Sequence, residues 1–312
     1  MISICVKNFL MNFNVIDETS NLRSVIIGIA KNSGNIPKIK DFYDPQSIQN
    51  FKNNNYPSEI DLVDELNSFV KVLRKNNIKV YRPNNIKNCN QIFVRDVGFV
   101  IDKTFFKSNI LPKRKMEYDG IKKILNEYQG EIVEIPHDIH VEGGDIISFS
   151  NNIFIGYYSK KNYSKLYTAR TNKNAIEFFK NYFPQKQIKE FHLNKSNTNP
   201  NKNALHLDCC LQIVGEMNAI ICPDLFTDKN DVIWLKSFFG EENILLINEI
   251  EMSSMHCNVL SLNKNTVVSQ PSFIRLNKWL EKMNFNIEKV DFNEVSKQGG
   301  SFRCCSLPII RN

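Results

Sequence analysis

The chain has 312 residues, enough for one large domain or two ordinary ones, and its 42% hydrophobic and 23% charged residues allow a sizeable buried core. The formal net charge of +7 comes from lysines scattered through an asparagine-rich sequence. The densest basic run, Lys113-Arg114-Lys115, is short, and without a basic stripe or interleaved aromatic residues we do not expect binding to nucleic acid.

Cysteine usage indicates the compartment. Eight cysteines are too sparse for a disulfide scaffold in a chain of this length, and none forms the Cys-x-x-Cys pair of a zinc knuckle. The adjacent pairs Cys209-Cys210 and Cys304-Cys305 indicate thiols that are kept reduced, which predicts a cytoplasmic protein. No apolar run reaches the length of a signal sequence or a membrane span, so no membrane association is expected. Residues 1–20 are interpreted as an N-terminal extension.

The first half of the chain alternates apolar runs with amphipathic stretches. Residues 23–30 are rich in β-branched side chains, which predicts a buried strand, and the polar passage from there to residue 56 predicts a loop. Ser58 is typical of a helix N-cap, and apolar residues then recur at helical spacing as far as residue 76. The further elements expected here are strands at 78–81, 91–94, 98–101 and 131–135, with a helix at 120–128.

The second half continues in the same order. Two strands flank the turn that follows Gly143-Gly144, and a helix over 172–183 ends before Pro184. The further elements expected are strands at 205–214, 219–222, 244–247, 259–262, 266–268 and 287–290, with helices at 228–239 and 271–283. Pairs of short strands therefore alternate with single helices roughly every 60 residues, with no linker between them. This order predicts one α/β domain over residues 21–312, assembled from similar units.

A glycine pair near the C-terminus precedes a cysteine that is a candidate nucleophile. Gly299 and Gly300 allow the backbone to adopt positive φ or to approach a ligand closely, and Cys304 follows shortly after. A cysteine becomes a nucleophile when its pKa is lowered or a base lies beside it. The alternative is a tight turn before a last strand with two buried thiols, because free cysteine is among the most buried residue types.

Three upstream stretches supply the acids and the base that such a nucleophile needs. Asp96, Glu142 and His206 each lie at the end of an apolar strand, where a loop would carry them to a common face. Asp208 follows His206 by two positions, and since side chains alternate along a strand, the two are expected to point the same way. The structural alternatives are a local ion pair of Asp96 with Arg95, a turn at Glu142 and a buried core histidine.

Together these residues supply a thiol, an imidazole and three carboxylates. A histidine near neutral pH can donate a proton and then take one back. Surplus carboxylates fit a cysteine protease poorly, since negative charge would oppose the thiolate and the oxyanion. They fit a flat cation, because a guanidinium presents forked donors that match carboxylates bidentately. The set therefore predicts chemistry on a guanidino group.

Four short stretches, taken in order, carry a family resemblance. They are Phe93-Val-Arg-Asp96, Val141-Glu-Gly-Gly-Asp145, His206-Leu-Asp208 and Gly299-Gly-Ser-Phe-Arg-Cys304. Together they resemble the signature stretches of the guanidino-group-modifying superfamily, which contains arginine deiminases, dimethylarginine dimethylaminohydrolases, agmatine deiminases and glycine amidinotransferases. The likeness runs from about residue 21 to the C-terminus. It implies a five-bladed α/β propeller, the pentein fold, with pseudo-fivefold ββαβ units.

The resemblance implies a covalent mechanism that needs no metal or other cofactor. Cys304 matches the nucleophile, His206 the general acid and base, and Glu142 the acid that orients the histidine and contacts the substrate. The thiolate would attack the guanidinium carbon, His206 would protonate the departing amine, and water deprotonated by His206 would cleave the S-amidino intermediate. Cys305 is offset by one position and has no assigned role.

The resemblance also implies how the substrate is held. Asp96 and Asp208 match the two aspartates that bind the guanidinium. The stretch Ala169-Arg-Thr-Asn172 is similar to an arginine deiminase stretch whose arginine binds the substrate carboxylate, which assigns that role to Arg170. The alternative is a surface arginine that caps the next helix. The expected partner is therefore a small guanidino compound, and the oligomeric state stays open.

The choice among members of the superfamily rests on a few positions. Glu142-Gly-Gly-Asp145 is similar to the hydrolases, whereas the Gly-Gly-Ser-Phe before Cys304 is also close to the transferases. Asp208 favours arginine over dimethylarginine, since two carboxylates on opposite edges prefer a guanidinium without methyl groups, and Arg170 favours an amino acid over agmatine. We expect a citrulline-forming hydrolase similar to arginine deiminase, although 312 residues leave no room for the helical insert of bacterial arginine deiminases. The alternatives are a dimethylarginine dimethylaminohydrolase, an amidinotransferase, and a non-catalytic propeller that binds ribosomes or RNA.

Overall fold

A hairpin, a helix and then a strand parallel to the hairpin form the recurring unit of the fold. The computed structural model describes residues 11–312, and its first unit along the chain contains β4 (Gly98–Ile101), β5 (Thr104–Lys107), α3 (Glu117–Leu125) and β7 (Glu131–Glu134). β5 runs antiparallel to β4 and parallel to β7. The helix supplies the crossover, because parallel strands cannot be joined by a tight turn.

The same order recurs three times further along the chain. These units contain β8 (Ile146–Phe149), β9 (Asn152–Tyr157), α4 (Asn174–Tyr182) and β10 (Gln187–His192); β11 (Leu211–Val214), β12 (Asn218–Ile221), α5 (Lys229–Phe239) and β13 (Ile244–Leu246); and β14 (Leu260–Asn263), β15 (Thr266–Ser269), α7 (Ile274–Lys282) and β16 (Asn286–Lys289). In each unit the first two strands are antiparallel and the third is parallel to the second. The prediction of similar α/β units is confirmed.

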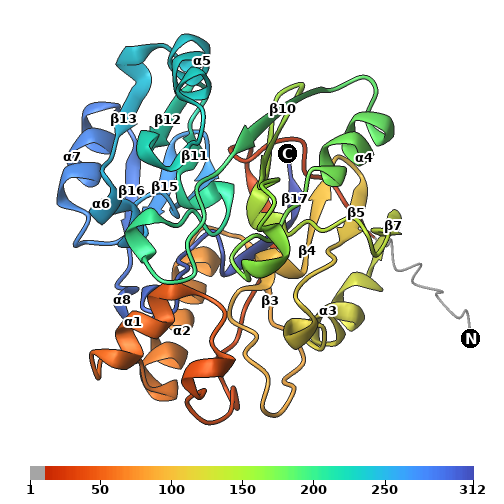
Figure 1. Ribbon diagram of the computed structural model, residues 1–312, viewed down its shortest axis with the longest axis vertical. Helices are drawn as coiled ribbons and strands as arrows, with labels where there is room; N and C mark the ends of the chain where they lie inside the picture. The colour runs from red at the N-terminus through yellow and green to blue at the C-terminus, as the bar shows by residue number, and fades with distance from the viewer. Residues whose placement is uncertain (1–10) are drawn as a thin grey trace, which may run out of the picture.

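A further sheet joins the two ends of the described chain. β17 (Ser306–Arg311) pairs antiparallel with β2 (Leu22–Ile27), and β2 pairs parallel with β3 (Lys79–Tyr81), which follows α2 (Glu59–Lys75). The C-terminal strand therefore takes the place of the first hairpin strand in this unit. β17 lies near the middle of the molecule, and α3, α4, α5 and α7 lie around the outside (Figure 1). Cys304, the candidate nucleophile, precedes β17 in the chain with one residue between them.

Short elements accompany the five three-stranded sheets of the described chain. β1 (Met11–Asn12) pairs with β6 (Tyr128–Gln129), and the short helices are α1 (Pro45–Lys52), α6 (Glu249–Ser253) and α8 (Asn293–Ser296). Phe13 and Val15 are buried in the same core cluster as Ile26 and Leu307. Residues 11–20 of the expected N-terminal extension therefore pack against the domain, and residues 1–10 of it lie outside the described residues.

Two helices begin and end where the sequence predicts. In α2 the Ser58 hydroxyl accepts the N–H of Asp61 and donates to its carboxylate, and Leu66 is among the apolar residues that the helix buries. In α5 the N-cap is Asp228, and the helix ends at Gly240, whose φ of 82° suits glycine. Local capping chemistry is therefore enough to place these helices, and both predictions are confirmed.

The apolar core lies where the helix of one unit packs against the sheet of the unit before it. Phe179 of α4 lies edge-on against Phe106 of β5, with ring centroids 5.3 Å apart. Trp234 of α5 contacts Phe154 of β9 in the same way, at 5.8 Å. Aromatic pairs of this geometry add to the energy of simple burial. The units therefore interlock through shared cores.

The strand expected at 91–94 is wrong. Gln91 makes only an isolated bridge, and a 3-10 helix, η2 (Val94–Val97), follows it. The N–H of Arg95 donates to the carbonyl of Cys304 at 3.1 Å. A backbone group that bonds across the molecule in this way is not available to a strand ladder, so the apolar pattern of this stretch does not produce a strand.

The strand expected at 205–214 begins late, at Leu211. A 3-10 helix, η7 (Leu207–Cys209), occupies the start of the predicted strand. The N–H of Leu207 donates to the carboxylate of Asp145 at 2.9 Å, and the N–H of Cys210 donates to the carbonyl of Leu207. Strand alternation is therefore not the reason that His206 and Asp208 face the same region. A second correction concerns the passage before residue 56, which contains α1 instead of loop alone.

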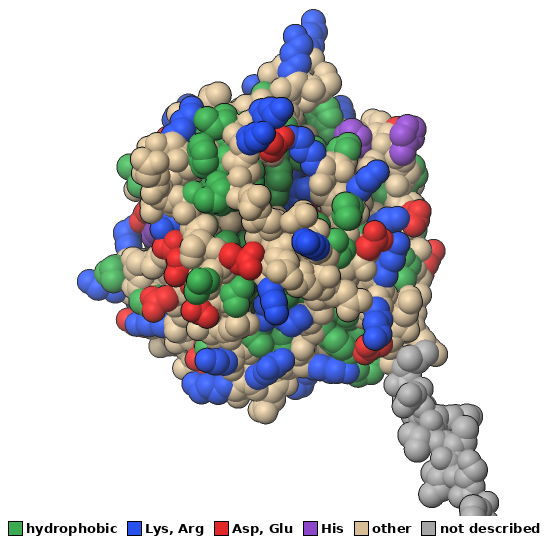
Figure 2. Space-filling model, turned by 90° about the horizontal axis from the view of Figure 1, so that it is seen from below, with side chains coloured by type: hydrophobic (Ala, Val, Ile, Leu, Met, Phe, Trp, Pro, Cys, Tyr) green, Lys and Arg blue, Asp and Glu red, His purple; other side chains and the backbone are tan. Residues whose placement is uncertain are grey.

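The outer surface mixes charges of both signs. On the face in Figure 2, Lys and Arg side chains are spread widely, with Asp and Glu side chains among them. In the part of the chain that the structure describes, no helix combines the length and the apolar character that a bilayer crossing requires. The candidate site residues, in contrast, are buried in the interior.

Candidate active site

The candidate site residues come from equivalent places in the units. The turns η2, η4 (Gly143–Asp145) and η7 lie just before the first hairpin strands β4, β8 and β11. Asn258 and Cys304 stand at the corresponding places before β14 and β17. Because these strand ends converge, side chains that are far apart in the sequence meet in one region.

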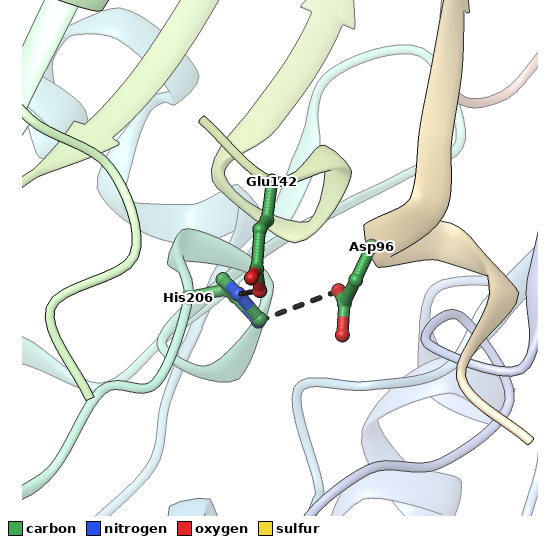
Figure 3. Close-up of side chains that lie close together, drawn as sticks. All are labelled: Asp96, Glu142 and His206. Atoms are coloured by element: carbon green, nitrogen blue, oxygen red, sulfur yellow. Dashed lines mark hydrogen bonds and ion pairs between the residues drawn. The ribbon is translucent and has the colours of Figure 1, made fainter. Parts of the chain in front are cut away.

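The imidazole of His206 lies between two carboxylates (Figure 3). Its Nε2 is 2.8 Å from Oε2 of Glu142, and its Nδ1 is 3.6 Å from Oδ1 of Asp96. All three side chains are buried. Nitrogen atoms that carry protons can face both acids at once, so the surroundings favour the imidazolium. The structure therefore brings together three of the residues predicted from the sequence.

The charges around His206 change the pKa values of the group. Burial by itself lowers the pKa of the imidazole, but the carboxylates of Asp96 and Glu142 outweigh burial and raise it above the ordinary value of 6.5. Burial would raise the pKa of Glu142, but the guanidinium of Arg170 and the hydrogen bond from His206 lower it below its usual range. The surroundings therefore favour the protonated imidazole and the ionised carboxylate of Glu142.

Neutralising Glu142 tests this charge arrangement. In Glu142→Gln we expect the pKa of His206 to fall, because the amide keeps the size of the side chain but removes the charge that stabilises the imidazolium. NMR titration of the imidazole, assigned with a His206→Gln variant, measures the change. The exposed Glu242→Gln serves as control, and an unchanged His206 pKa in Glu142→Gln would contradict the arrangement.

The raised pKa of His206 also has a consequence for stability. A folded-state pKa above the unfolded-state value means that protonation of His206 stabilises the fold fully below the ordinary value of 6.5. That contribution is lost as the pH rises through the folded-state pKa.

Cys304 is buried beside a carboxylate. Its Sγ lies 3.6 Å from Oδ2 of Asp208, and its N–H donates to Oδ1 of Asn258 at 3.0 Å. Asn258 Oδ1 also accepts the N–H of Ser301 at 3.0 Å, so one amide holds the loop on both sides of the turn. A Cβ on Gly300 would lie 2.5 Å from the ring of Phe93, which explains the glycine there.

The thiol of Cys304 is held in its neutral form. Burial raises its pKa well above the ordinary 9.0, and the charges of Asp208 and Asp96 raise it further. Asp96 thus influences both Cys304 and His206, and the N–H of Arg95 donates to the carbonyl of Cys304. The segment around Asp96 therefore joins the thiol and the imidazole into one site.

Asp208 forms an ion pair with a buried arginine. Its Oδ2 accepts from Nη1 of Arg303 at 2.7 Å, and Nη2 of Arg303 donates to Glu18 at 2.9 Å. Nη1 of Arg95 lies 3.7 Å from the same carboxylate of Glu18. All of these side chains are buried. Asp208 is therefore fixed by a charge network that also includes a residue of the expected N-terminal extension.

Glu18 makes the stability of the fold sensitive to acid. Burial by itself raises its pKa, but Arg303 and Arg95 outweigh burial and lower the pKa from 4.5 to about 2. This stabilisation is present above the unfolded-state pKa and is lost as the pH falls through the folded-state pKa, a change of about 3 kcal/mol. We expect the free energy of unfolding of Glu18→Gln to fall less steeply than that of wild type over this range, in pH-dependent urea unfolding. Parallel slopes would contradict the prediction.

Two buried arginines contact the other carboxylates. Nη1 of Arg170 donates to both oxygens of Glu142 at 3.1 and 2.9 Å, and Nη1 of Arg114 donates to Oδ2 of Asp96 at 2.7 Å. Both guanidinium groups lie over the ring of Tyr43, at 5.5 Å for Arg114 and 5.7 Å for Arg170. Arg170 is thus buried and paired, so the alternative of a surface arginine that caps the next helix is wrong.

The three groups in Figure 3 are close enough to share a cation. Ligand atoms of Asp96, Glu142 and His206 lie within 4.8 Å of one another. However, Arg114 and Arg170 already bring positive charge to both carboxylates. A metal ion there would face two guanidinium groups, which repel it, whereas a flat organic cation can exchange with them. The donor set therefore fits a guanidinium better than a metal.

Four buried residues of the site carry no sequence pattern that predicts them, namely Arg114, Asn258, Arg303 and Glu18. Weak signals exist for two of them. Arg114 and Glu117 have the i, i+3 spacing of a helical ion pair, which the structure contains. Asn258 lies just before a hairpin strand, as Asp96 does. Arg303 and Glu18 are found only from the fold, because they are far apart in the chain.

Solved structures of other proteins share the fold of this chain. SxtG, an amidinotransferase of saxitoxin biosynthesis from Microseira wollei, superposes with a TM-score of 0.74 at 19% identity, over 96% of this chain and 97% of that one. The N-terminal domain of ArgZ, a cyanobacterial arginine dihydrolase, superposes with a TM-score of 0.76 at 16% identity, over 92% of this chain and 98% of that one. Together with the match of a family model to residues 44–311, this fold places the chain in the guanidino-group-modifying superfamily.

The particular family follows from the sequence comparison. The family described as N,N dimethylarginine dimethylhydrolase, eukaryotic, matches residues 44–311, and the chain belongs to this family. The chain is also 30% identical over 250 residues to the uncharacterized protein YkgA of Bacillus subtilis strain 168, over 80% of each chain. The substrate of this chain is therefore inferred from the chemistry of the site.

Proposed function

We propose that the chain is a cysteine-dependent hydrolase of the guanidino group of arginine or a close derivative, which forms citrulline through a covalent S-amidino intermediate. The observation that carries the proposal is the imidazole of His206 between Glu142 and Asp96, in the same buried region as the thiol of Cys304. In this proposal Cys304 is the nucleophile, His206 the general acid and base, and Glu142 the acid that orients the imidazole.

Binding of the cationic substrate activates the thiol. With Asp96 and Asp208 holding the guanidinium, its positive charge offsets the negative charges that raise the pKa of Cys304. Oδ2 of Asp208, 3.6 Å from Sγ, is placed to accept the thiol proton and to return it to the thiolate after turnover. The reactive thiolate therefore forms mainly when substrate is present, and the thiol of the free protein reacts only slowly near neutral pH.

His206 then moves one proton in each direction. The thiolate forms a bond to the guanidinium carbon, and the carbon–nitrogen bond to the leaving amine breaks as the imidazolium donates its proton to that amine. The neutral imidazole next takes a proton from water, whose oxygen attacks the same carbon. The carbon–sulfur bond breaks, citrulline and the thiolate are released, and the proton of the new hydroxyl passes to the departed amine, which leaves as an ammonium ion. One water is consumed and the positive charge of the guanidinium leaves on the ammonium, so atoms and charge balance.

Arg114 and Arg170 can bind the α-carboxylate of an amino-acid substrate. When the guanidinium, held by Asp96 and Asp208, also contacts Glu142, Arg114 and Arg170 lose part of their ion pairs with Asp96 and Glu142, and the α-carboxylate of the substrate compensates for this loss. A cavity of about 390 Å³ is lined in part by Tyr43 and Phe93, which adjoin these arginines and the Cys304 loop. This cavity supports entry of the substrate from that side.

Membership of the dimethylarginine family supports a second candidate, a dimethylarginine dimethylaminohydrolase. Asp208 is the residue that favours unmethylated arginine, but its Oδ2 is already bonded to Arg303. A hydrogen bond from a substrate nitrogen to Asp208 therefore depends on Oδ1, which lies 3.8 Å from Sγ of Cys209. Both substrates use the same nucleophile and acid, and they differ in the amine that leaves.

One assay separates the candidates. Purified protein is incubated with arginine, monomethylarginine, asymmetric dimethylarginine and agmatine, and citrulline, ammonia and alkylamines are measured. Citrulline with ammonia supports arginine hydrolysis, and citrulline with dimethylamine supports the second candidate. If a guanidino product forms only when glycine or another amine is added, the reaction is amidino transfer. If no guanidino compound is consumed, the proposed function is wrong.

We further propose that the five three-stranded sheets are the blades of a closed five-bladed propeller. The pairing of β17 with β2 supports this, because it combines the last described strand with the first strands of the domain. In such a closed arrangement the turns before the five first strands would surround one axis. That places Asp96, Glu142, His206, Asn258 and Cys304 around a single substrate.

A further inference from the structure

Asp145 is a buried carboxylate that the mechanism does not use. The acid is fully buried, and Arg and Lys side chains form no ion pair with it in the described chain. Its two oxygens have separate partners: Oδ1 accepts the N–H of Leu207 at 2.9 Å, and Oδ2 accepts the hydroxyl of Thr171 at 2.6 Å. A buried carboxylate costs free energy unless its hydrogen bonds are made, so both contacts are needed to keep it there.

The two partners stand next to the residues of the site. Leu207 follows His206, and Thr171 follows Arg170. The Oγ1 of Thr171 also accepts the N–H of Glu142 at 3.4 Å, and the N–H of Asp145 donates to the carbonyl of Glu142 at 3.0 Å. Glu142, and the residues next to His206 and Arg170, which bond to its carboxylate, thus belong to a single hydrogen-bonded unit around Asp145.

Close packing leaves this unit little freedom. A Cβ on Gly144 would lie 2.7 Å from the ring of His206, and a Cβ on Gly156 would lie 2.5 Å from Oδ1 of Asp145. The absence of side chains at both glycines lets the turn and the imidazole approach. On the other side of His206, the ammonium of Lys195 donates to the carbonyls of Ala204 and Leu205, both at 2.8 Å.

From this geometry we propose that Asp145 is a positioning residue, which together with the hydroxyl of Thr171 holds His206, Arg170 and Glu142 at their mutual distances. The inference rests on the proposed function for its effect on rate. It does not depend on that function for its effect on structure. A shift of His206 by a fraction of an ångström weakens the 2.8 Å hydrogen bond to Glu142, which sets the protonation of the imidazole.

Variants of Thr171 and Asp145 test the proposal without changing a residue of the proposed chemistry. Thr171→Val removes the hydroxyl and keeps the shape, whereas Thr171→Ser keeps the hydroxyl. Asp145→Asn keeps the size but turns one acceptor into a donor. We expect kcat to fall about 10- to 100-fold in Asp145→Asn and Thr171→Val, with KM changed less than about threefold, and Thr171→Ser to restore most of the rate.

A matched control separates positioning from loss of stability. Thr168 is also fully buried, and its hydroxyl donates to Asn197 outside the unit. Thr168→Val should therefore lose stability comparably but keep kcat. The second readout is the NMR titration of His206, whose pKa should fall in Asp145→Asn and Thr171→Val. An unchanged kcat and His206 titration in folded Asp145→Asn, or an equal loss in Thr171→Ser, would overturn the proposal. If wild type consumes no guanidino compound while the titration shifts as expected, the proposed function fails and the positioning role stands.

Discussion

Replacement of Cys304 by serine is expected to lower kcat by about 10⁴-fold or more. The serine hydroxyl occupies the same place, but its pKa is too high for it to lose its proton, even when a cation lies beside Asp208. The covalent intermediate therefore does not form. The measurement is citrulline formation under saturating substrate. Mass spectrometry of quenched wild-type reactions should also detect an adduct on the peptide that contains Cys304.

The neighbouring thiol provides the control for this experiment. Cys305 is buried in the same core cluster as Cys304, and its carbonyl accepts the N–H of Gly28. Cys305→Ala should retain turnover within a few-fold, with a modest loss of stability. Near-normal activity in Cys304→Ser, or an adduct found on Cys305, would show that the nucleophile has been assigned wrongly.

Replacement of Arg303 by methionine is expected to lower the free energy of unfolding by about 3–5 kcal/mol. Arg303 is fully buried and pairs with Glu18 and Asp208, so its removal leaves two carboxylates without their cation inside the protein. Urea unfolding at neutral pH measures the loss. The same change also leaves the charge of Asp208 uncompensated beside Cys304, so any folded variant should react with thiol reagents more slowly than wild type.

An exposed arginine gives the comparison. Arg275 also pairs with a glutamate, Glu251, but half of its side chain is accessible to solvent. Ion pairs of that kind contribute about 1 kcal/mol or less, since water solvates both charges when the pair is broken. Arg275→Met should therefore change the stability little. Equal effects of the two substitutions would mean that the buried network around Arg303 does not stabilise the fold.

The identity of the site residues could be predicted from sequence because reactive side chains stand in short local motifs. The candidate residues Asp96, Glu142, His206, Asp208 and Cys304 all stand in such motifs, and their chemistry by itself predicts a flat cationic substrate. The reason that strand alternation gives for the pairing of His206 with Asp208 is nevertheless wrong. Both residues lie at a 3-10 turn instead of in a strand, and the N–H of Leu207 in that turn is bonded to Asp145.

The electrostatics of the site could not be predicted in the same way. Asp96 is paired with Arg114, Glu142 with Arg170 and Asp208 with Arg303, and the sequence analysis predicts none of these ion pairs. These partners lie 18, 28 and 95 positions away in the chain. No periodicity connects residues at such separations, so the resting charge of the site is a property of the fold.

The sequence by itself determines the order of hairpins and helices, the helix caps and the set of reactive side chains, because each of these depends on neighbours within a few positions. Tertiary structure alone decides that the last strand pairs with β2, that Glu18 reaches Arg303, and that Asp145 connects the turns of three motifs. The physical reason is that buried charges and carboxylate hydrogen bonds are satisfied by whichever groups the folded backbone brings within about 3 Å.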